Sequence, residues 1–184
     1  MTVRTSLVER ARGGDPAAFD ALVAMDGDRC LAIAYRITRD HAIAEDAVQQ
    51  AFITAWRGLP RLRDPQRFDA WLQRLLVNAC YQELRQLRRW KDRIAPLPVE
   101  GPSGADAYRS ANDRDALDRA FRRLSPDRRA IFVLHHHAGL PLAEVAEIVG
   151  LPVGTVKSRL HYATDILRAA LAADERVIDA EVIA

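Results

Sequence analysis

Residues 142–171 read LAEVAEIVGLPVGTVKSRLHYATDILRAAL, and this stretch decides the fold class of the second half of the chain. Gly150 stands where a short helix would end in a left-handed residue, and Leu151 and Pro152 make a turn. A second, longer helix is expected to begin near Val153. A short helix, a glycine turn and a long helix together predict a helix-turn-helix.

The expected second helix has an apolar side and a polar side. Its apolar residues recur about every four positions and form one stripe: Val156, Leu160, Ala163, Leu167 and Leu171. The candidate DNA-reading residues lie near its start and on its polar side: Thr155, Lys157, Ser158, Arg159, His161 and Tyr162. Such a helix suits the major groove of DNA. A helical hairpin with a solvated face is the alternative, and small Ala146 and Gly150, where the helices must approach closely, favour DNA binding.

Helix signals also mark the rest of the chain. Asp or Ser precedes Pro at three expected helix starts: Asp15–Pro16, Asp64–Pro65 and Ser125–Pro126. Apolar residues recur at three- and four-residue steps over 44–56 and 68–79, and no stretch alternates convincingly with period two. The sequence therefore predicts an all-α fold of two small helical domains joined by a flexible linker, the second being the helix-turn-helix domain.

One segment interrupts the helical pattern. Residues 93–112 contain several prolines and glycines and no helical stripe, which predicts the linker. The expected domains are then residues 1–92 and 113–173. The tail, residues 174–184, is assigned no role.

Composition excludes several classes of protein. With 49% hydrophobic residues among 184, the chain can bury a core, and a net charge of +2 does not by itself establish nucleic-acid binding. Cys30 and Cys80 lie far apart and form no C-x-x-C motif, so we expect reduced, buried thiols. No signal peptide and no apolar run of membrane-spanning length is visible, which predicts a cytoplasmic protein without membrane insertion.

Catalytic and metal-binding patterns are also missing from the sequence. It contains no nucleophile–base pair, phosphate loop or metal cluster, so no enzyme activity, cofactor or metal is expected. The run His135–His137 does not change this expectation, because consecutive helical residues point about 100° apart and cannot share one ion.

The first half carries two candidate binding surfaces. Asp46, Gln49 and Gln50 lie at helical steps, so we expect them to project together, opposite Val48 and Phe52, toward a basic, donor-rich partner or into solvent. The helix that begins near residue 68 ends in basic side chains: Arg85, Arg88, Arg89 and Lys91. A second basic cluster comes just before that helix: Arg57, Arg61, Arg63 and Arg67. Together the two clusters predict a phosphate-binding track.

Three tryptophans complete the sequence-based assignment. Trp90, inside the basic run, is placed either to stack on a base or to cap the surface. Trp56 and Trp71 follow the apolar stripes, so we assign them to the core.

Several segments resemble one known family, the extracytoplasmic-function (ECF) sigma factors of bacterial RNA polymerase. GLPVGTVKSRL, preceded by LSPDRRAIFVLHHHAGLPLAEVAEIVG, resembles the family's promoter-reading domain. AEDAVQQAFITAW resembles the polymerase-binding helix, and FDAWLQRLLVNACYQELRQLRRWK resembles the helix for the minus-ten element. The resemblance implies that Asp46, Gln49 and Gln50 bind core polymerase, that Asn78 touches an unpaired base, and that the helix-turn-helix reads the minus-thirty-five element. Tyr162 departs from the family, which usually carries Arg there.

The function predicted is that of a sigma factor that binds core RNA polymerase and directs promoter-specific initiation. The implied partners are core polymerase, promoter DNA and an anti-sigma factor. A stand-alone helix-turn-helix repressor or activator is one alternative, and it would bind duplex DNA tightly without polymerase. A sigma-like decoy that sequesters an anti-sigma factor is another, although this chain keeps its basic clusters.

Overall fold

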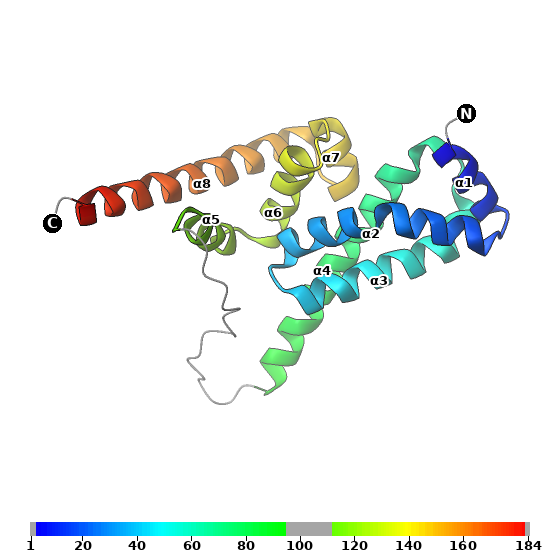
Figure 1. Cartoon of the computed structure of the whole chain (residues 1–184), viewed down its shortest axis with the longest axis horizontal. Coiled ribbons are helices and arrows are strands. Elements are labelled where there is room, and N and C mark those ends of the chain that lie inside the picture. The colour runs from blue at the N-terminus through cyan, green and yellow to red at the C-terminus, as the bar shows by residue number, and fades with distance from the viewer. Residues whose placement is uncertain (1–2, 95–111, 183–184) are drawn as a thin grey trace.

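The computed structural model describes residues 3–94 and 112–182, and within them it describes side chains except for residues 91–94, 112–117, 171 and 173–182 (Figure 1). The N-terminal domain consists of α1 (Val3–Arg12), α2 (Pro16–Thr38), α3 (His41–Gly58), the 3₁₀ turns Leu59–Arg61 and Pro65–Arg67, and α4 (Phe68–Ile94). The C-terminal domain consists of α5 (Asn112–Arg123), α6 (Pro126–Phe132), a π-helical turn (Val133–His137), α7 (Leu142–Val149) and α8 (Val153–Val182). The described residues contain no strand, so the all-α prediction is confirmed.

Helix caps account for two of the three expected starts. The Asp15 side chain accepts a hydrogen bond from the Ala18 N–H, 3.2 Å away, and α2 follows. Asp64 caps the 3₁₀ turn that leads into α4. Ser125 precedes α6 with Pro126 in its first turn, but its hydroxyl makes no capping hydrogen bond.

The N-terminal domain is a bundle in which α4 packs against α2 and α3. Fully buried side chains from the three helices fill its centre, among them Leu22, Ile33 and Leu76. Helix α1 is fastened to this bundle by Arg4, which bonds to buried Asp26 at 2.7 Å and to Asp69. This packing leaves one side of α3 uncovered, and that side carries the first candidate site.

The helix-turn-helix forms as predicted. Helix α7 ends at Val149, and Gly150 adopts a left-handed conformation with φ 69° while its N–H bonds to the Ala146 carbonyl. Helix α8 starts at Val153. Its expected stripe is buried at Val156, Ala163 and Leu167 and half-buried at Leu160, whereas the Leu171 side chain lies outside the described residues.

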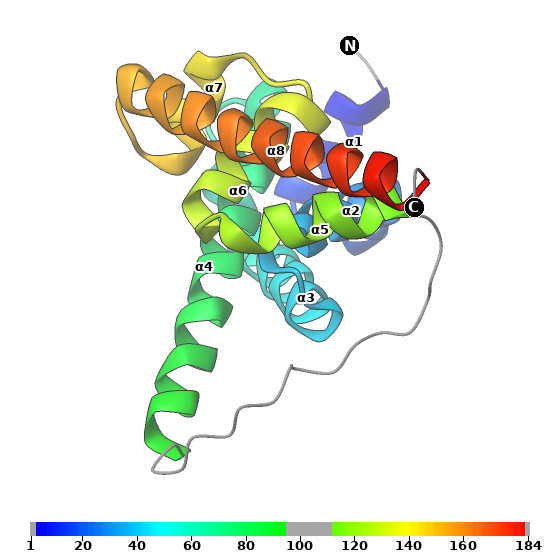
Figure 2. The same ribbon diagram turned by 90° about the vertical axis from the view of Figure 1, so that its left-hand side faces the viewer.

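The two domains pack directly against each other, which the sequence did not predict. One continuous cluster of buried apolar residues runs from the N-terminal helices into α6, the π-helical turn and α7. Figures 1 and 2 show α6 and α7 lying against the N-terminal helices. Helix α4 contacts α7, and α2 contacts α6. We call this contact the seam. Two ion pairs cross it: Arg67 with Glu147, and Arg39 with Asp118.

Some sequence-based assignments need correction. Trp56 is 38% exposed and is not a core residue, whereas Trp71 is half-buried. In α7 the buried residues are Val145, Ala146 and Ile148, and Ile148 packs into the cluster that crosses the seam, whereas Val149 is half-buried. The predicted linker, apart from its end residues, and the last two residues of the tail lie outside the described residues.

Candidate functional site

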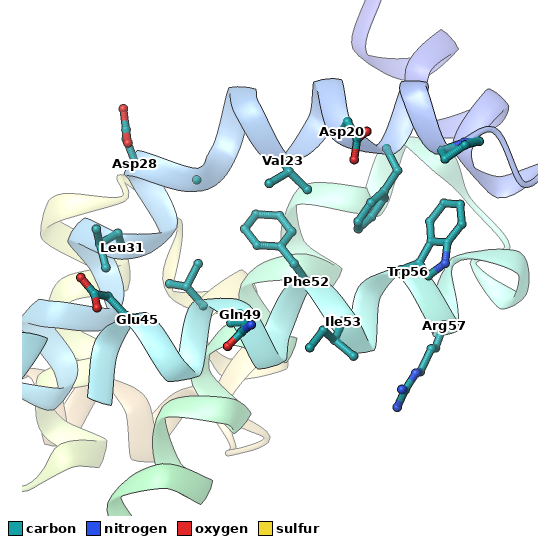
Figure 3. Close-up of a pocket in the computed structure, with 14 residues that line it drawn as sticks. Asp20, Val23, Asp28, Leu31, Glu45, Gln49, Phe52, Ile53, Trp56 and Arg57 are labelled. Carbon is teal, nitrogen blue, oxygen red and sulfur yellow. The ribbon is translucent and has the colours of Figure 1, made fainter. Parts of the chain in front are cut away.

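An apolar groove runs between α2 and α3 (Figure 3). Its volume is about 810 Å³. Apolar side chains from both helices line it: Phe19, Val23, Leu31, Val48, Phe52, Ile53 and Trp56. Three carboxylates also border the groove, from Asp20, Asp28 and Glu45, and one cation, Arg57. The groove therefore offers an open apolar floor with mostly acidic edges.

Sequence periodicity placed only part of this face correctly. Gln49 lines the groove together with Val48 and Phe52 and does not lie opposite them. Gln49 and Phe52 are three residues apart, so they are neighbours on the helix surface. Asp46 is exposed beside the groove, outside its lining. Gln50 is half-buried, and its side-chain amide donates to the Thr54 hydroxyl at 3.1 Å.

The groove itself was missed by the sequence analysis, although a signal was present. Val48, Phe52, Ile53 and Trp56 make the apolar stripe of α3 wider than burial against the bundle requires. Ile53 and Trp56 are each 38% exposed in consequence. A broad stripe of this kind marks a helix that packs on its own domain and on a partner.

Helix α4 presents the second candidate surface. Three exposed residues share one face of this helix, because Arg85 follows Asn78 by seven residues and Arg89 follows Arg85 by four. Arg88 is exposed on the neighbouring face, whereas the Lys91 side chain lies outside the described residues. Trp90 is 59% exposed, which leaves its ring open to a stacking partner.

The basic cluster before α4 divides between two places. Arg57 borders the α2–α3 groove, whereas Arg63 and Arg67 line a separate cavity of about 510 Å³ together with Arg74 and Trp71. Residues of α7 also line this cavity, and one of them forms the ion pair with Arg67. The structure thus brings three arginines together next to an aromatic ring.

The third candidate surface is the start of α8. Lys157, Ser158 and His161 are exposed, while Thr155 and Arg159 are half-buried. The polar groups here contact residues of α8 itself and of α6. The Ser158 hydroxyl donates to the Thr155 carbonyl at 3.0 Å, and Arg159 Nη1 lies 3.4 Å from Asp127 Oδ2.

Tyr162, which departs from the expected arginine, has a charged neighbour. It is 49% exposed, and the guanidinium of Arg128 lies 4.0 Å from the centre of its ring. The cation–π contact places a positive charge next to the position where the family pattern would have one. His161 Nε2 lies 3.4 Å from Asp165 on the next turn.

Cysteines and histidines form no further site within the described residues. Burial raises the pKa of Cys30 and of Cys80 to about 12, so both are poor nucleophiles. The three histidines lie in the π-helical turn, where His135 Nδ1 bonds to the Leu140 carbonyl at 2.8 Å. No group of three potential metal ligands occurs there or elsewhere in 3–94 and 112–182. No helix in these ranges is long and apolar enough to cross a membrane.

Comparisons with known proteins agree on one family. Residues 22–90 match the family model for sigma-70 region 2, and residues 114–163 match the model for sigma-70 region 4. The RNA polymerase sigma-H factor of Pseudomonas aeruginosa is 31% identical over 90% of this chain and 92% of its own length. The ECF RNA polymerase sigma factor SigE of Mycolicibacterium smegmatis is 32% identical over 86% of this chain, which corresponds to 65% of SigE.

Solved structures show the same similarity. The complex of the sigma factor RpoE with the anti-sigma factor NepR from Bartonella quintana matches with a TM-score of 0.70 and 26% identity, over 85% of this chain and 98% of that chain. CnrH in complex with the cytosolic domain of CnrY matches with a TM-score of 0.67 and 28% identity, over 94% of this chain and 99% of that chain.

Proposed function

The chain belongs to the ECF sigma factors of RNA polymerase, and on this premise we propose how its surfaces divide the work of promoter-specific transcription initiation. A sigma factor binds core RNA polymerase and directs it to promoters. One observation supports assigning different roles to the two matched regions, which is that they expose different surfaces. The first exposes an apolar groove with acidic edges, and the second exposes a helix start rich in hydrogen-bond donors.

The α3 face is our proposed docking surface for core polymerase. Asp46, Gln49 and Gln50 supply hydrogen-bonding groups, and the groove beside them supplies apolar area through Ile53 and Trp56. Apolar anchors surrounded by polar groups are the usual composition of a protein–protein interface. The acidic edges favour a partner that carries basic residues.

Helix α4 is our proposed surface for the minus-ten element. An amide such as Asn78 can read an unpaired base, because it offers both a donor and an acceptor. Arg85, Arg88, Arg89 and Lys91 are proposed to hold the phosphate backbone. Trp90 is placed to stack on a base.

The start of α8 is our proposed surface for the minus-thirty-five element. Lys157, Ser158, Arg159, His161 and Tyr162 follow the left-handed turn at Gly150, with Thr155 in the first turn of the helix. A helix-turn-helix places these N-terminal residues of its second helix against base edges in the major groove.

An anti-sigma factor is our proposed regulatory partner. Support comes from the RpoE–NepR complex, whose sigma factor covers most of this chain. Two further parts of the proposal are that the protein is non-catalytic and that it acts in the cytoplasm. The proposed domain boundaries are residues 1–92 and 113–173, and the two family-model matches, residues 22–90 and 114–163, lie within them.

Run-off transcription with purified core polymerase over a promoter library tests this assignment. We expect initiation that requires both core enzyme and this protein. Tight binding to a palindromic duplex without core enzyme, combined with no core-dependent initiation, would identify a stand-alone repressor instead. Binding to an anti-sigma factor with no transcription at all would identify a decoy.

A further inference from the structure

Four arginines interact electrostatically where the C-terminal end of α2 meets α5 and α6. Arg39 follows the last residue of α2, and Arg88 lies on α4, so both belong to the N-terminal domain. Arg122 lies on α5 and Arg129 on α6, so both belong to the C-terminal domain. The positive charges of the other three all act on Arg129. The seam therefore has one end with an unusual concentration of like charge.

Two of these arginines are buried with unused hydrogen-bond donors. Arg129 is 7% exposed, and the Arg39 side chain is 9% exposed. The Nε of each has no hydrogen-bond partner. Buried charged groups are normally paired and hydrogen-bonded, so donors left in this state indicate a missing acceptor.

The counter-charge available among the described residues is small. Asp118 Oδ2 lies 2.5 Å from Arg39 Nη2 and forms an ion pair with it. The Arg39 guanidinium also lies 5.2 Å from the centre of the Tyr35 ring and 6.0 Å from that of Phe121. These rings cover the face of the Arg39 guanidinium, and its Nε–H remains without an acceptor. Among the side chains that the structure describes, no other carboxylate pairs with any of the four arginines.

The cluster keeps its charge at neutral pH. Burial, followed by repulsion from Arg39, Arg88 and Arg122, lowers the pKa of Arg129 to about 10. A group with this pKa is still protonated at pH 7. Four positive charges and one negative charge therefore meet at a partly desolvated place, where an anion would be bound strongly.

We propose that the four arginines form a binding site for a small anion that carries several phosphate groups. Guanidinium groups bind phosphate oxygens through paired N–H donors, and several phosphates match a cluster with three uncompensated charges. Each domain contributes two of the arginines, so a bound anion holds the domains together across the seam. Arg88 also belongs to the proposed minus-ten surface, so such a ligand competes with promoter DNA for that residue.

Isothermal titration of the full-length chain with sodium tripolyphosphate, pyrophosphate and orthophosphate tests the site at constant ionic strength. We expect saturable 1:1 binding that tightens with each added phosphate. A saturating concentration of tripolyphosphate should also raise Tm by on the order of 5 °C. ATP serves as a second probe: equal affinity would mean that the phosphate chain alone is recognised, and tighter binding would mean that a nucleotide is the natural source.

Adjacent arginines provide matched controls. Arg122 and Arg123 are both exposed near the end of α5, but only Arg122 acts on Arg129. R122Q should weaken tripolyphosphate binding by about tenfold, whereas R123Q should change it less than twofold. R88Q and R89Q make the same comparison from α4. R129Q should abolish binding, and the other variants keep the test decisive if R129Q does not fold.

Three results would overturn the proposal. The first is the absence of saturable binding at constant ionic strength. The second is equal weakening by both members of each arginine pair, which would mean general screening of surface charge. The third is displacement of tripolyphosphate by a short duplex without promoter sequence through the same arginines, which would assign the cluster to nucleic-acid phosphates.

Discussion

The α3 groove and the start of α8 are both exposed, yet they are built in opposite ways. The groove has an apolar floor, on which Ile53 and Trp56 are more than a third exposed. The start of α8 exposes Lys157, Ser158 and His161 over a buried stripe. Removing apolar area from water against a partner protein lowers the free energy of the complex. Exposed hydrogen-bond donors contribute little to such an interface, but they contribute much to the binding of a polyanion. The contrast teaches that the two surfaces are suited to different kinds of partner.

The largest effect is expected from a charge placed in the groove. I53R should lower affinity for core polymerase by on the order of 100-fold, because it puts a cation at the centre of a desolvated interface. The affinity is measured by fluorescence anisotropy with labelled full-length protein. M25R is the control, since Met25 is 53% exposed on α2 but outside the groove. Equal losses in the two variants would break the comparison.

A smaller effect is expected at α8. K157A should weaken binding of the reconstituted holoenzyme to promoter DNA by about tenfold and reduce the salt dependence by about one phosphate contact. Affinity for core polymerase should not change. R168A, which removes an exposed cation further along α8, is the control. A loss of core affinity in K157A would contradict the separation of the two surfaces.

The turn that presents α8 should show a more modest effect on stability. G150A forces alanine into φ 69° and should lower the free energy of unfolding by about 1 kcal/mol. G154A is a matched control, because Gly154 lies in the helix with open space around its Cα. Since alanine has the higher helix propensity, G154A should leave stability unchanged or raise it by less than about 1 kcal/mol. Urea unfolding measures both, and the same sign in both variants would contradict the explanation.

The smallest effect is expected at the ion pair between Arg67 and Glu147, which links the two domains across the seam. Arg67 and Glu147 are both exposed, so reversing either charge should cost the seam less than about 1 kcal/mol. The double reversal, R67E with E147R, should restore most of that loss at low salt. Small-angle scattering of the four proteins reports how far the domains separate. Additive effects in the double variant would mean that the pair does not couple the domains.

Local signals in the sequence predicted much of the fold. Asp15 and Asp64 cap as expected, and Gly150 ends α7 as expected, because each of these depends on a few neighbouring residues. The apolar stripe of α8 was likewise predictable from its period. All of these features follow from helix geometry alone.

The seam and the groove were not predictable in the same way. A periodic pattern shows that Ile148 or Trp56 is apolar on one side of a helix, but not which element covers that side. Ile148 turned out to be covered by the other domain, whereas Trp56 is only partly covered, by Phe19 of α2. The arginine cluster was also out of reach, because its members are up to 90 residues apart in sequence and meet only when the domains pack.

The placement of the three tryptophans has a practical consequence for spectroscopy. Trp56 lies in the α3 groove, Trp71 in the cavity shared with α7, and Trp90 on the exposed end of α4. The solvent around a different indole thus changes in each of three candidate events: docking of polymerase, separation of the domains and capture of the minus-ten strand. Variants that keep a single tryptophan would let intrinsic fluorescence follow the order of these events in real time, without any attached label.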